Sequence, residues 1–120
     1  MTTRVKILGT VYKVRLCVPY DKDPSLRGRF GYTSFPGKVI VIADICTIPG
    51  WEAASDNEIL DTFYTTVRHE VIHAYLMESG LNTSANAVDC WARNEEMVDW
   101  FAIQFPKILD TFEKLRCVGR

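Results

Sequence analysis

The chain has 120 residues, 48% hydrophobic and 12% aromatic, and this length and composition suit one globular domain spanning residues 1–120. Its 14 basic residues nearly balance its 15 acidic residues, and the net charge of −1 without a basic run argues against a nucleic-acid partner. Basic residues interrupt the apolar positions of the N-terminal segment, which argues against a signal peptide or membrane span there. We therefore expect a cytoplasmic protein with no membrane partner.

Strands are predicted in the first third of the chain. Residues 4–18 alternate apolar with basic or polar side chains around Gly9 and Thr10, which predicts a β-hairpin with one solvated face. Turn-forming residues dominate positions 19–28, and a short extended segment and a Pro-Gly turn follow. Residues 39–43 form the clearest strand because they are almost entirely β-branched.

Helices are predicted in the rest of the chain. Ser55 is expected to cap the first helix, with Glu58 reaching back to the cap, and Gly80 is expected to end it. A second helix should run over about residues 87–104, and Pro106 either ends it or begins a third. Strands followed by helices predict an α+β fold, with a small and mostly antiparallel N-terminal sheet.

Both histidines of the chain occur in one motif, His69-Glu70-x-x-His73, in the middle of the first predicted helix. Residues four apart on a helix are neighbours, so both imidazoles can direct a ring nitrogen at one point about 2.0–2.1 Å away, which suits Zn²⁺. Glu70 is offset around the helix, where it would lie beside a metal-bound water as a base rather than bind the metal. The alternative is an ordinary solvated or packed helix face.

A second cluster, 94-NEEMVD-99, offers the third ligand that two histidines require. Glu95 can supply a carboxylate that leaves one coordination position open for chemistry. Asp99 lies on the same helix face, where it could accept a hydrogen bond from the outer ring nitrogen of a ligand histidine. The alternative is that Glu95, Glu96 and Asp99 form a solvated acidic face.

The motif HEVIH followed by N-E-x-x-x-D resembles the gluzincin class of zinc metallopeptidases, of which thermolysin is the familiar member. The small size and the segment 95-EEMVDWFA-102 are more similar to ImmA/IrrE-type and minigluzincin-type peptidases, many of them from bacteria, archaea and phages. The resemblance implies that His69, His73 and Glu95 bind zinc. It also implies that Glu70 is the catalytic acid/base and that Asp99 is the partner of a ligand histidine.

The same resemblance implies a minimal zincin-like architecture, with the small sheet packed on an active-site helix and a glutamate-bearing helix. It places a substrate-binding strand at the sheet edge above the cleft, formed here by Val39, Ile40, Val41, Ile42 and Ala43. Many gluzincins also use a histidine, tyrosine or arginine to stabilise the oxyanion. The candidates here are Arg93, Tyr64 and Tyr32, which the sequence does not rank.

These features predict a zinc metalloendopeptidase that hydrolyses peptide bonds through a zinc-activated water, with Glu70 taking and returning the proton. The partner would be a peptide or protein held in extended form by main-chain hydrogen bonds. A catalytically inactive, zinc-stabilised interaction module is the alternative, although structural zinc sites are usually rich in cysteine. The sequence determines neither the substrate nor the oligomeric state.

Overall fold

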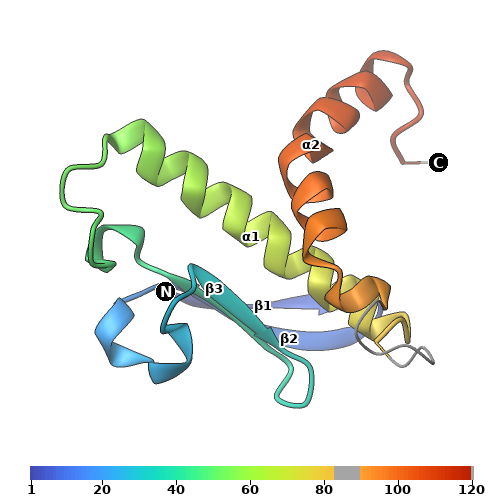
Figure 1. The fold of residues 1–120 in the computed structure, drawn as a ribbon. Helices are drawn as coiled ribbons and strands as arrows, with labels where there is room; N and C mark the ends of the chain where they lie inside the picture. The colour runs from blue at the N-terminus through green and yellow to red at the C-terminus, as the bar shows by residue number, and fades with distance from the viewer. Residues whose placement is uncertain (83–89, 120) are drawn as a thin grey trace.

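The computed structural model describes residues 1–82 and 90–119, which combine a four-stranded sheet with two long helices (Figure 1). Helix α1 packs on one face of the sheet, and α2 packs on the C-terminal half of α1 before projecting away from it (Figure 1). The predicted α+β class is therefore confirmed. The elements are β1 (Thr2–Ile7), β2 (Thr10–Val18), β3 (Gly31–Ser34), β4 (Val39–Ala43), α1 (Asp56–Glu78) and α2 (Glu95–Lys114).

The predicted hairpin is formed by β1 and β2, which pair in antiparallel register from Thr2↔Arg15 to Ile7↔Thr10. Leu8 and Gly9 connect the strands with φ values of 49° and 85°. Positive φ at both loop positions gives a turn whose twist matches that of the strands it joins. The hairpin therefore closes tightly, and its alternating sequence points apolar residues at α1 and basic residues at solvent.

The sheet is mixed, with strand order β1-β2-β4-β3. Its outer pairs, β1 with β2 and β3 with β4, are antiparallel, whereas the central pair β2 and β4 is parallel. The prediction that Val39–Ala43 is an edge strand is therefore wrong. This segment is β4, which is hydrogen-bonded on both sides, and its residues Ile40 to Ala43 are fully buried. The short strand β3 forms the edge instead.

Helix α1 follows the local signals of its sequence closely. The Ser55 hydroxyl accepts from the Glu58 amide while the Glu58 carboxylate accepts from the Ser55 amide, which is the predicted capping box. The helix ends at Glu78, and Gly80 takes the positive φ that commonly ends a helix. Its apolar face covers a buried cluster made of Ile7, Tyr12, Val14, Ile40, Ile42 and Ala74.

The second helix differs from its prediction at both ends. Residues 91–93 form a short 3-10 turn called η4, and α2 begins only at Glu95, after Asn94. The predicted residues 87–89 lie outside the described part of the chain. At its other end α2 continues through Pro106 to Lys114, so Pro106 neither ends the helix nor begins a third. Among the described residues, no helix is long and apolar enough to span a membrane.

Candidate metal centre

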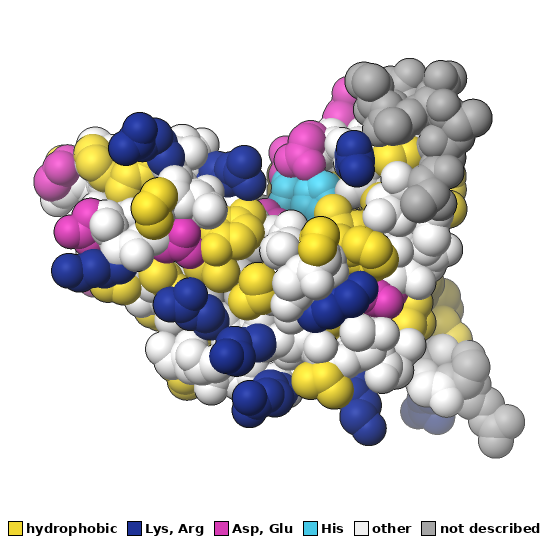
Figure 2. Space-filling model, turned by 90° about the horizontal axis from the view of Figure 1, so that it is seen from below, with side chains coloured by type: hydrophobic (Ala, Val, Ile, Leu, Met, Phe, Trp, Pro, Cys, Tyr) yellow, Lys and Arg dark blue, Asp and Glu magenta, His cyan; other side chains and the backbone are white. Residues whose placement is uncertain are grey.

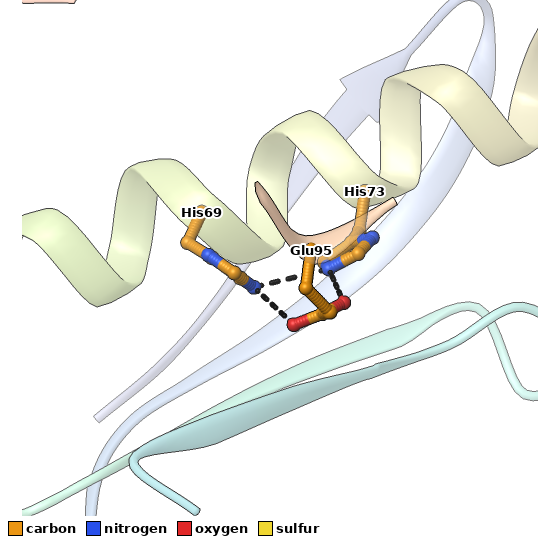
Figure 3. A group of neighbouring side chains, drawn as sticks. All are labelled: His69, His73 and Glu95. Carbon is orange, nitrogen blue, oxygen red and sulfur yellow. Dashed lines mark hydrogen bonds and ion pairs between the residues drawn. The ribbon is translucent and has the colours of Figure 1, made fainter. Parts of the chain in front are cut away.

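His69 and His73 lie one turn apart on α1, and both side chains point toward Glu95 (Figure 3). Each imidazole is held at its outer nitrogen. Nδ1 of His69 donates to Asp99 Oδ1 at 2.6 Å, and Nδ1 of His73 donates to the backbone carbonyl of Ala92 in η4 at 2.7 Å. A carbonyl only accepts, so the hydrogen of His73 must be on Nδ1. These two contacts fix the orientation of both rings.

In the neutral tautomer with its hydrogen on the outer nitrogen, each ring presents a lone pair from its inner nitrogen to the same point. The Nε2 atoms of His69 and His73 lie 3.0 Å apart. Two neutral imidazoles in these tautomers cannot hydrogen-bond each other there, because neither Nε2 carries a hydrogen. A cation at that point would be attracted to both lone pairs, and neutral imidazole is a common metal ligand. The arrangement of donors therefore suits a bound metal ion.

Glu95 completes the group from the first turn of α2. Its Oε1 lies 2.8 Å from Nε2 of His73, and its Oε2 lies 3.2 Å from Nε2 of His69 (Figure 3). Asn94 places it there, because the Asn94 side chain accepts from the Met97 amide and makes Glu95 the first residue of the helix. The ligand atoms of His69, His73 and Glu95 all lie within 4.8 Å of one another, so these residues could hold a metal ion.

Glu70 lies beside this group but is anchored differently. Its side chain is only 8% exposed, and the Thr33 hydroxyl of β3 lies 2.9 Å from both its Oε1 and its backbone carbonyl. Its Oε2 is turned toward the centre, 3.8 Å from Nε2 of His69. Burial raises the pKa of this carboxyl above its ordinary value, although the hydrogen bond from the Thr33 hydroxyl opposes the shift. Glu70 is therefore a buried carboxyl with one oxygen available to a reactant.

The group borders a cleft of about 880 Å³. The edge strand β3 forms one wall, α1 forms the floor, and η4 with the start of α2 forms the other wall. The Glu95 side chain is 68% exposed, and part of the histidine surface is visible from outside next to acidic side chains (Figure 2). A molecule in the cleft can therefore reach the three ligand residues and Glu70.

The structure brings together five of the predicted site residues, namely His69, Glu70, His73, Glu95 and Asp99. It does not bring β4 to them as an edge strand, because β3 lies between β4 and the open side of the sheet. Thr33 was missed, because nothing in the sequence relates it to Glu70. Asn94 could have been found, because a side chain that can cap directly precedes the two glutamates.

The structure distinguishes the three residues that were candidates for stabilising the oxyanion. Arg93 and Tyr32 line the cleft, whereas Tyr64 is not part of its lining. The Tyr32 hydroxyl donates to Asp23 at 2.6 Å, and burial together with this bond raises its pKa. The Arg93 guanidinium makes no hydrogen bond or ion pair within the described chain. Arg93 is therefore the candidate that is available to a ligand.

Comparison with known proteins gives no match: no family model, curated protein or solved structure is significantly similar to this chain.

Proposed function

We propose that this chain is a zinc-dependent metallopeptidase of minimal zincin-like architecture, in which His69, His73 and Glu95 hold the metal. One observation carries the proposal: two imidazole nitrogens and a carboxylate converge beside a buried glutamate in an open cleft. Two histidines and a carboxylate are a ligand set of catalytic zinc sites, whereas structural sites are closed by four protein ligands. The resemblance to gluzincins, and to the small ImmA/IrrE-type peptidases among them, points the same way.

The dimensions of the ligand group fit zinc. Ligand atoms about 2.0–2.2 Å from a tetrahedral ion lie roughly 3.3–3.5 Å from one another, and the separations here are 3.0 Å between the two imidazoles and 2.8 to 3.2 Å to the carboxylate. Side-chain shifts of a few tenths of an ångström would admit the ion. Zinc supplies Lewis acidity, which polarises a peptide carbonyl and lowers the pKa of water toward about 7.

Glu70 would carry the proton during hydrolysis. Thr33 holds its Oε1, so Oε2 is the atom that accepts a proton from the attacking water and returns it to the leaving amine. Burial raises the pKa of this carboxyl, which makes it a stronger base toward the proton of the attacking water. The cationic side chain of Arg93 would stabilise negative charge on the carbonyl oxygen.

The substrate would be an extended peptide segment bound along β3. Within the part of the chain that the structure describes, this strand pairs only with β4, so its other edge offers unpaired main-chain donors and acceptors. Residues Gly31 to Thr33 line the cleft, which puts that edge next to Glu70. Main-chain hydrogen bonds along an edge strand bind peptides with little dependence on their sequence. The substrate class is therefore a peptide or an accessible loop of a protein.

The decisive experiment compares the wild type with Glu70→Gln, after zinc reconstitution, on an unbiased pool of peptides analysed by mass spectrometry. Glutamine keeps the shape of glutamate and the bond to Thr33 but cannot carry the proton. We expect both proteins to bind about one zinc ion, and cleavage to fall roughly 10²–10⁴-fold in the variant. A wild type that binds zinc and cleaves nothing would favour the zinc-stabilised interaction module. A wild type that binds no zinc would refute the metal site itself.

A further inference from the structure

Pro106 lies inside α2, where it removes the hydrogen-bond donor of one backbone carbonyl. In an α-helix the N–H of a residue donates to the carbonyl four positions earlier, so a proline at 106 leaves the Ala102 carbonyl without its helical donor. The proline ring also crowds that carbonyl. Ala102 is fully buried, and a buried backbone carbonyl normally has a partner.

The partner is Arg68 of α1. Its Nε donates to the Ala102 carbonyl at 2.6 Å, and its Nη2 donates to the Thr65 hydroxyl one turn earlier on the same helix at 3.3 Å. A guanidinium stays charged at all working pH values and makes short, strong hydrogen bonds in a fixed geometry. The bond thus connects α1 to α2 at a point where the sequence of α2 leaves an acceptor unpaired.

This connection lies next to the metal centre. Arg68 directly precedes His69, and Ala102 lies one turn beyond Asp99, the acceptor of the His69 ring. The remaining polar contacts between the two helices run through the ligand group itself, from His69 and His73 to Glu95 and Asp99. Among the described elements, α2 packs mainly against α1 and η4 and then projects from the molecule (Figure 1), so these contacts largely determine its position.

We infer that Arg68 is a positioning residue for the metal centre. By satisfying the carbonyl that Pro106 releases, it holds α2 where Glu95 and Asp99 reach the two histidines before a metal ion arrives. The inference rests on the proposed metal site, and it assigns Arg68 no contact with metal or substrate. Without this bond α2 would sample other positions, and the ion would have to order the helix as well as bind.

A double-mutant cycle separates this role from a general effect on folding. Arg68→Met removes the donors and keeps an unbranched side chain of similar length, and Pro106→Ala restores the helical donor to Ala102. Zinc affinity is measured by competition with a chromophoric chelator for the wild type, both single variants and the double variant. We expect Arg68→Met to weaken zinc binding roughly 10-fold, because the ion would then have to order α2 as well as bind. Pro106→Ala should restore most of this loss.

Two further measurements sharpen the comparison. Arg29→Met removes a positive charge that lines the cleft of the metal centre, and the Arg29 side chain makes no hydrogen bond within the described residues. It therefore reports the effect of charge alone and should change zinc affinity less than Arg68→Met. The visible spectrum of Co²⁺ bound in place of zinc reports the coordination geometry of the folded fraction. It should change in Arg68→Met and return toward that of the wild type in the double variant. A residue needed only for stability would lower the melting temperature and leave this spectrum unchanged.

Each remaining outcome contradicts either the inference or the metal site. If Arg68→Met lowers zinc affinity by the same factor whether residue 106 is proline or alanine, Arg68 does not act through the Ala102 carbonyl. Unchanged affinity in Arg68→Met would also overturn the inference, and so would a double variant that fails to fold. If the wild type binds neither zinc nor Co²⁺, the metal site is wrong, and the inference about Arg68 falls with it.

Discussion

Replacement of Asp99 by asparagine tests whether the structure has the correct partner for His69. The change keeps the size of the side chain and removes its charge, and the contact at stake is the 2.6 Å bond from His69 Nδ1 to Asp99 Oδ1. A carboxylate in this position holds the ring in one tautomer and makes its inner nitrogen a better ligand. An asparagine oxygen can still accept the hydrogen, but a neutral bond is roughly half as strong. Zinc affinity should therefore fall without being lost.

The size of the loss follows from the exposure of Asp99. Outer partners of metal ligands typically contribute 10–100-fold to affinity, which corresponds to about 1.4–2.7 kcal/mol. The Asp99 side chain is 58% exposed, so water screens the interaction and can partly replace the missing acceptor. We therefore expect a loss near the lower limit, roughly 10-fold or about 1.4 kcal/mol.

Glu96→Gln is the matched control for this change. It removes the same charge from the same helix, but Glu96 is exposed and is not part of the ligand group. Zinc affinities of both variants are measured by competition with a chromophoric chelator at one pH and ionic strength, and circular dichroism checks the fold. Similar affinities for Asp99→Asn and Glu96→Gln would mean that only charge matters, and the assignment of Asp99 would fail.

Three other changes test the rest of the site and its scaffold. Glu95→Gln should weaken zinc binding more than Asp99→Asn, because it removes a ligand. A loss no larger than that of Glu96→Gln would mean that Glu95 is not the glutamate of α2 that faces the metal. Gly31→Val should lower the free energy of unfolding in urea by about 1–3 kcal/mol, because an added Cβ would lie 2.7 Å from the Val41 carbonyl; no change would contradict that packing. Lys38, 2.6 Å away, holds the pKa of Glu78 below its usual range. The ion pair therefore stabilises the folded state at pH values above the pKa that Glu78 has in the unfolded chain. This stabilisation is lost as the pH falls through the lower pKa that Glu78 has in the folded state. The melting temperature of the wild type should fall more between pH 6 and pH 3 than that of Glu78→Gln, and equal falls would refute the assignment.

Local signals in the sequence predicted the individual elements well. The capping box at Ser55, the stop at Gly80 and the β-branched run of residues 39–43 each determine structure within a few residues. The His69–His73 spacing likewise places two imidazoles on one helix face whatever surrounds the helix. These predictions rest on backbone geometry, which does not require knowledge of distant neighbours.

The errors concern features that distant residues decide. The composition of β4 suits a buried strand, but only pairing with both β2 and β3 makes it central and gives the cleft edge to β3. Proline ordinarily breaks a helix, yet Pro106 is tolerated within α2, whose Ala102 carbonyl is satisfied by a side chain 34 residues earlier in the sequence. Neither fact can be obtained from a window of neighbouring residues.

The sequence by itself therefore determined which residues could bind a metal and which segments are helix or strand. Tertiary structure alone decided how these residues meet: Thr33 against Glu70, the Ala92 carbonyl against His73, and Asp99 against His69. The physical reason is that the type of an element depends on local backbone preferences and periodicity. Contacts between elements depend instead on which buried surfaces and unpaired polar groups can be satisfied together when the whole chain folds.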